Sequence, residues 1–151
     1  MDINKLKSFL SLQVISKDKH LIELKVTASN GRFYAITDVY DTAEPILKFA
    51  ETLRGFPHEN SDMLYETGFK NESSSFSMHF YCIDSAGHFA LGINLMDNVK
   101  TEFKHIQKNK TRIEIIVEQK AIRSFQKELS RLATKLEGAA ILYGRDSTIS
   151  S

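Results

Sequence analysis

The sequence has few of the residues that mark several large classes of protein. Its 151 residues include one cysteine, two prolines and no tryptophan. A single cysteine forms neither an internal disulfide nor a thiolate zinc site, so Cys82 indicates a reducing, cytoplasmic compartment. No apolar run approaches the roughly 20 residues that a membrane-spanning helix requires. The opening MDINKLKSFL has no apolar stretch and no small-residue cleavage site, so we expect neither a secretory signal nor membrane association.

The chain also lacks an excess of charge of one sign. Lys and Arg total 20 and Asp and Glu total 19, so the net charge of +1 favours no class of partner. The distribution is less even, because residues 1–75 hold 9 basic and 11 acidic side chains, whereas residues 76–151 hold 11 and 8. Most of the positive excess lies between Lys100 and Lys135.

The material for a hydrophobic core is present. Hydrophobic residues make up 42% of the chain, with ten phenylalanines and five tyrosines. A chain of this length can bury roughly 70% of its unfolded surface without disulfides or metals. We therefore expect a single α+β domain over residues 1–144 and a flexible C-terminal tail over residues 145–151.

Alternating apolar residues predict a mostly antiparallel sheet or sheets of about seven or eight strands. Asn30-Gly31 favours a two-residue hairpin, and residues 84–87 favour a four-residue hairpin loop. Residues 57–63 and 71–75 are typical of loops, while residues 97–111 either extend a hairpin or form a long loop. The expected strands are 9–16, 20–27, 32–40, 65–69, 76–83, 88–96, 112–118 and 139–144.

Two segments share the spacing Ile-x-x-Phe-x-x-x-Leu, at residues 46–53 and 122–129. This spacing predicts two amphipathic helices. The first is expected to begin at Asp41 or Thr42, either of which can cap it, and to stop at Gly55. The second is expected to run from about residue 121 to Gly138, with basic residues on its outer surface.

The repeated spacing has two interpretations. Each helix follows alternating strands and precedes a Leu-Tyr pair, at residues 64–65 and 142–143, which favours a duplicated β-meander-plus-helix unit. Alternatively, the spacing is common to amphipathic helices and recurs by chance. The α+β architecture holds under both interpretations.

Motifs for catalysis and for cofactors are missing from the sequence. It contains no Gly-rich phosphate loop, no HExxH and no GxSxG. His79 and Cys82 fall on opposite faces of one expected strand, which argues against a Cys-His pair, and we expect Cys82 to be a small buried core residue. We expect no enzyme activity, no cofactor and no metal.

Two polar segments are candidate partner-binding surfaces. The first is the acidic loop around His58, Glu59 and Asp62, which has the residue types of a metal or acid/base site but is more often a solvated loop. The second is basic, and it suits either a solvated hairpin, an acidic protein partner or a nucleic acid, although Phe103 is its sole aromatic. Its candidate residues are Lys100, Lys104, His105, Lys108 and Lys110.

Three segments carry a resemblance to known proteins: LKFAETL at residues 47–53, the DSAGH hairpin at 84–88, and FQKELSRL…LEGAAIL at 125–142. Their order over residues 20–144 resembles a set of small stand-alone bacterial domains of unknown function. Some of these are suspected immunity proteins that neutralise toxins delivered by neighbouring cells. The strand–helix doubling is also similar to the Whirly arrangement, a fold used for single-stranded DNA binding, although the Lys- and Gly-rich signature of Whirly proteins is missing.

The sequence and this resemblance together favour a non-enzymatic bacterial protein that binds another protein. The resemblance implies that the partner is a toxin domain whose active site is occluded. The alternative is a nucleic-acid-binding module that uses residues 100–112. Steep weakening of binding with salt would distinguish the nucleic-acid module from a protein interface.

Overall fold

The computed structural model describes residues 7–19, 21–67 and 74–145. The elements follow the order strand, strand, strand, helix, strand, and this order occurs twice. The first half contains β1 (Ser8–Lys17), β2 (Ile22–Asn30), β3 (Tyr34–Asp41), α1 (Ala43–Leu53) and β4 (Asp62–Glu66). The second half contains β5 (Ser75–Cys82), β6 (Phe89–Lys100), β7 (Ile106–Val117), α2 (Gln119–Lys135) and β8 (Ala139–Tyr143). The predicted α+β class with about eight strands and two helices is confirmed.

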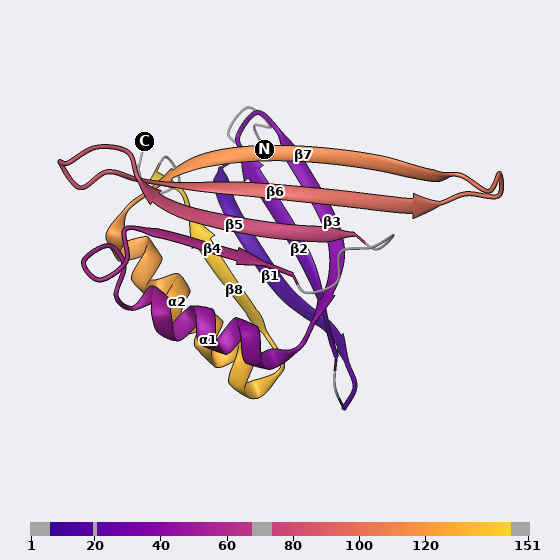
Figure 1. Ribbon diagram of the computed structural model, residues 1–151, viewed down its shortest axis with the longest axis horizontal. Coiled ribbons are helices and arrows are strands. Elements are labelled where there is room, and N and C mark those ends of the chain that lie inside the picture. The colour runs from indigo at the N-terminus through magenta and orange to yellow at the C-terminus, as the bar shows by residue number, and fades with distance from the viewer. Residues whose placement is uncertain (1–6, 20, 68–73, 146–151) are drawn as a thin grey trace.

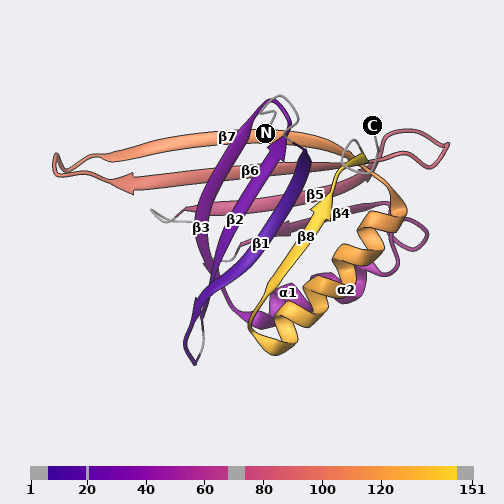
Figure 2. The same ribbon diagram turned by 180° about the vertical axis from the view of Figure 1, so that it is seen from behind.

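The strands form two antiparallel sheets, and each sheet takes one strand from the other half of the chain. The first sheet has the order β3-β2-β1-β8, and the second has the order β4-β5-β6-β7. In Figures 1 and 2 the strands of the two sheets cross face to face, and both helices lie side by side at one end. The strand that follows each helix therefore completes the sheet of the opposite half.

The two halves correspond closely in position along the chain. The helices begin at Ala43 and Gln119, which are 76 residues apart, and β3 and β7 end at the same separation. The expected equivalence of the two Leu-Tyr pairs is wrong by one residue, because Tyr65 and Leu142 point inward while Leu64 and Tyr143 are exposed. The two halves therefore correspond in the buried face of β4 and β8, and not in the identical Leu-Tyr residues.

One continuous core lies between the two sheets and the two helices. The alternating positions that the sequence assigns to the strand interiors are buried, among them Leu10, Leu12, Met78 and Phe80. Cys82 departs from this pattern, because it lies at the exposed end of β5. The expectation that Cys82 is a buried core residue is wrong, since the strand leaves the core before reaching it.

The helices meet across the shared apolar spacing, and one buried polar bond joins them. Ile46, Phe49 and Leu53 of α1 are buried, as are the equivalent residues of α2. The side-chain amide of Gln126 in α2 donates a 2.9 Å hydrogen bond to the carbonyl of Ala50 in α1. Because both groups are buried, the bond offsets the cost of removing them from water, and it fixes the two helices relative to each other.

A second buried polar bond ties the start of α1 to the second sheet. The Tyr65 hydroxyl of β4 donates a 2.5 Å hydrogen bond to Asp41 Oδ2, while Asp41 Oδ1 accepts from the amide of Thr42. Asp41 is 2% exposed. The expected capping role is wrong, because neither the Thr42 side chain nor Asp41 accepts an amide from inside the first turn. Asp41 instead joins the two sheets.

Several boundaries differ from the sequence predictions. The two-residue turn between β2 and β3 lies at Gly31-Arg32, one residue later than predicted, because the Asn30 amide donates to the Phe33 carbonyl. Asn30 Oδ1 also accepts from the amides of Arg32 and Phe33. Asp62 begins β4 and is not part of a loop. α2 ends at Lys135, before Gly138. The strand predicted over 65–69, the loop predicted over 71–75 and the tail predicted over 145–151 each extend outside the described residues, and Ser75 of that loop begins β5.

We expect Phe125→Ala to destabilise the protein by about 3–5 kcal/mol, because Phe125 is completely buried and its removal leaves a cavity between α2 and the sheets. Urea unfolding measures the change. Lys127→Ala on the exposed face of the same helix is the control, with an expected change within about 0.5 kcal/mol. Equal effects of the two substitutions would contradict the assignment of α2 to the core.

We expect Tyr65→Phe to cost about 1–3 kcal/mol, because the buried Asp41 carboxylate loses a donor. Burial, and then the charge of Asp41, raise the pKa of Tyr65 above its ordinary value. The stabilisation that comes from keeping the Tyr65 hydroxyl protonated in the folded state is complete below about pH 10, and it decreases as the pH rises further. Unfolding between pH 8 and 11 should show this fall in the wild type and a weaker one in Tyr65→Phe.

Candidate functional site

The most prominent surface feature is the far end of the β6–β7 hairpin, which we call the arm and define as residues 97–109. The described pairing of β5 with β6 stops at Ser75 opposite Met96, whereas the β6–β7 pairing continues to Lys100 opposite Ile106. Figure 1 shows the arm extending well beyond both sheets. Of the two sequence interpretations of residues 97–111, the extended hairpin is therefore correct.

The root of the arm is held by polar contacts with both sheets. The buried hydroxyl of Thr37 in β3 donates a 2.7 Å hydrogen bond to Asp97 Oδ1. The Asn109 side chain donates to the carbonyl of Asp97 at 3.3 Å, and the amide of Asn98 donates to the Ser74 hydroxyl at 3.0 Å. These bonds fix the direction in which the arm leaves the body of the molecule.

The tip of the arm presents apolar side chains to solvent. Thr101 closes the turn, since its amide and its hydroxyl both donate to the carbonyl of His105. Phe103 in this turn is 76% exposed, and Val99 just before it is also exposed. An exposed phenylalanine in an ordered turn is a natural contact residue for a partner surface.

Basic side chains surround this tip and continue along β7. The five basic candidates from the sequence all lie on the arm or at its root, and all are exposed. Along β7, Lys108, Lys110 and Arg112 alternate in the opposite phase to the buried Ile113 and Ile115. They therefore share the outer face of the second sheet, the face turned away from the first sheet. We call these three residues the basic row.

The acidic candidates lie far from the arm, so the structure does not join the two predicted surfaces. His58 and Glu59 are exposed in the turn after α1, and Asp62 is opposite Tyr81 at the other end of the second sheet. Tyr81 is in turn opposite Ala90, ten residues along β6 from Lys100. Ten residues of strand span about 33 Å.

The outer face of the second sheet carries a polar row that the sequence reasoning did not find. His79 Nε2 lies 2.7 Å from Asp62 Oδ1, and its ring is 4.9 Å from that of Tyr81. The Tyr81 hydroxyl donates to Glu114 Oε2. Burial, followed by this bond, raises the pKa of Tyr81. The alternation of His79 and Tyr81 with the buried Met78 and Phe80 is the sequence pattern that indicates this polar row.

Gly92 makes room for this polar row. Its neighbours pair without a register shift, so β6 has no bulge at this glycine. A Cβ atom at Gly92 would lie 3.0 Å from a guanidinium nitrogen of Arg112. The glycine therefore leaves room for the Arg112 side chain, and not for the main chain of another segment. Next to it, a depression of about 590 Å³ opens on the outer face, lined in part by Ser77, Asn94 and Arg112.

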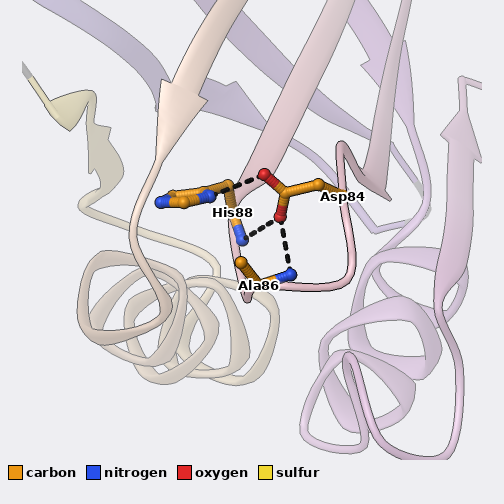
Figure 3. A network of polar contacts seen from close by, with 3 residues as sticks. All are labelled: Asp84, Ala86 and His88. Atoms are coloured by element: carbon orange, nitrogen blue, oxygen red, sulfur yellow. Dashed lines mark hydrogen bonds and ion pairs between the residues drawn. The ribbon is translucent and has the colours of Figure 1, made fainter.

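The β5–β6 loop forms a self-contained network, shown in Figure 3. Asp84 Oδ1 accepts from the amides of Ala86, at 2.8 Å, and His88, at 3.4 Å, while Asp84 Oδ2 lies 2.8 Å from His88 Nδ1. The hydrogen bond from His88, followed by that from the Ala86 amide, lowers the pKa of Asp84. His88 thus stabilises its own loop. The two residues are exposed, and their geometry is that of a turn.

Among the residues that the structure describes, no three His, Cys, Asp or Glu side chains are placed to hold a metal ion. Within the same part of the chain, no helix is long and apolar enough to cross a membrane. Compared with protein-family models and with curated proteins, the chain matches neither.

We expect His88→Ala to raise the pKa of the Asp84 carboxyl towards its ordinary value, because the side-chain hydrogen bond from His88 is the largest cause of its depression. Carbon-13 NMR titration of the Asp84 carboxyl measures the shift. Ser85→Ala in the same loop is the matched control and should leave the titration unchanged. A wild-type titration identical to that of His88→Ala would show that the bond does not form in solution.

Proposed function

We propose that this chain is a non-enzymatic protein-binding domain, and that it acts in the bacterial cytoplasm as an immunity protein that occludes the active site of a cognate toxin. The observation that supports this proposal is the arm, with Phe103 exposed at its tip and basic side chains around it. The resemblance of residues 20–144 to suspected immunity proteins points in the same direction.

The arm has the properties of an inserting element. Its two strands run side by side and extend about 10 Å beyond Asp97, and the anchored root prevents the arm from folding back. Interface energy concentrates in a few large side chains that become fully desolvated, with charged groups at the rim. Phe103 would fill the centre of such a contact, and Lys100, Lys104 and His105 would form its rim.

The charge of the arm defines the partner surface that it fits. The arm together with residues 110–112 at its root holds five Lys or Arg and two acidic side chains. Charge of this sign accelerates association with an acidic cleft. A nuclease carries a basic cleft for its substrate, so an inhibitor that used the arm would have a toxin of another class as its partner. A nuclease partner would instead engage the acidic end near Glu59 and Asp62.

Nucleic-acid binding is the second candidate, and the shape of the arm favours it. The major groove of DNA admits a two-stranded β-ribbon, and the arm is a ribbon that carries Lys100, Lys104 and Lys108, with Lys110 at its root. Such binding would weaken with log[salt] at a slope close to the number of phosphates contacted. A protein interface centred on Phe103 would lose far less affinity over the same range of salt.

We expect Phe103→Asp to weaken binding of the partner that co-purifies from native lysate by about 30-fold, equivalent to roughly 2 kcal/mol, because a charge replaces the central apolar contact. Titration with the purified partner measures the affinity. Leu64→Asp is the control, because Leu64 is also exposed but lies on β4. The proposal fails if the two variants bind equally, or if the retained material is nucleic acid.

A further inference from the structure

The second sheet ends at β7 in a basic strand edge, with which no other strand pairs among the described residues. The sheets have four edge strands: β3, β8, β4 and β7. β8 and β4 have five residues each, and β8 packs against α2. β7 has twelve residues, and its outer face carries the basic row of Lys108, Lys110 and Arg112. A strand edge of this length has unpaired main-chain groups that can accept another strand.

The residues of the basic row lie at the β7 positions whose main-chain N–H and C=O groups point away from β6. The Thr101 amide donates to the His105 carbonyl, so these two opposite residues form a hydrogen-bonded pair that closes the hairpin. Along an antiparallel ladder, pairs whose main chains are hydrogen-bonded to each other alternate with pairs that are not. Val99 with Gln107 and Asp97 with Asn109 are therefore bonded pairs. It follows that Lys108, Lys110 and Arg112 direct their N–H and C=O groups away from β6.

The fold itself does not require basic residues at this edge. Seventy-six positions before Lys110 and Arg112 are Tyr34 and Ile36 of the equivalent edge β3, whereas the position equivalent to Lys108 is Arg32, just before β3. Tyr34 and Ile36 are exposed, so an edge in the same place tolerates apolar side chains at two of the three positions. Lysines on an edge also discourage pairing with arbitrary strands. The basic row therefore excludes neutral and basic strands while attracting an acidic one.

We propose that an extended, acidic segment of the partner protein adds to the second sheet as a fifth strand alongside β7. The proposal rests on the proposed protein-binding function and specifies how the partner is recognised. Alternate residues of a strand lie about 6.8 Å apart, so carboxylates at every second position would face Lys108, Lys110 and Arg112 in turn. Main-chain hydrogen bonds give affinity and the alternate side chains give specificity.

The intervening positions define the rest of the segment. Gln107, Asn109 and Thr111 point to the other face of β7 and carry no charge. The residues of the added strand between its carboxylates would lie beside them and should be small and polar. The preferred sequence therefore alternates Glu or Asp with residues such as Thr, over about seven positions.

The test uses two synthetic peptides with blocked ends and the same composition, one with alternating Thr and Glu over eight residues and one with four Thr followed by four Glu. We expect the alternating peptide to bind at least 10-fold more tightly by fluorescence anisotropy. Hydrogen exchange followed by NMR should then show new protection at the amides of Lys108, Lys110 and Arg112. Equal binding of the two peptides, or protection by a 12-nucleotide DNA strand in place of the peptide, would overturn the proposal.

Two substitutions at one position separate charge from strand addition. Lys110→Gln removes the charge and should weaken binding of the alternating peptide about three-fold to ten-fold. Lys110→Pro also removes an N–H that faces away from β6, so the β6–β7 ladder stays intact but binding should be lost. A thermal unfolding curve close to that of Lys110→Gln confirms that the proline variant folds. Equal peptide affinities of the two variants would refute strand addition and would leave the Phe103 test of the proposed function unaffected.

Discussion

Each sheet of this protein is completed by a strand from the other half of the chain, since β8 pairs with β1 and β4 pairs with β5. This exchange requires each helix to pass from one sheet to the other. Both helices consequently lie at the same end of the molecule, where Phe49 and Phe125 pack around Phe80. The Gln126–Ala50 and Tyr65–Asp41 hydrogen bonds occur at these crossings, so two of the buried polar contacts lie where the halves interlock.

The two halves share a core but differ at their surfaces. The second half lengthens its last hairpin to produce the arm, and it replaces Tyr34 and Ile36 with Lys110 and Arg112 at the equivalent edge. Both changes lie outside the buried face, so neither disturbs packing. A repeated fold can in this way keep the same core in both halves while one half carries an additional projecting hairpin, with the Thr37–Asp97 bond holding that hairpin to the other half.

The sequence predicts the architecture well because burial imposes a period on each element. Alternation at Leu10, Leu12 and Phe80, and the helical spacing of Phe49 and Phe125, locate the strands and helices of the core. The sequence also indicates which residues of the arm are basic. It does not show that the arm and the His58–Asp62 region lie at opposite ends, because strand pairing sets that separation. Cys82 and Asp41 were misassigned because their environments depend on where β5 ends and on a tyrosine 24 residues away.

The mutual completion of the sheets has a consequence for the integrity of the chain. Either half alone would expose the flank of its own sheet and the apolar side of its helix, so neither has a closed interior. A chain cut between the halves should consist of two fragments that are each incomplete and that restore the structure only by reassociating. By the same logic, two intact molecules at high concentration could trade halves, giving an intertwined pair whose interior is unchanged.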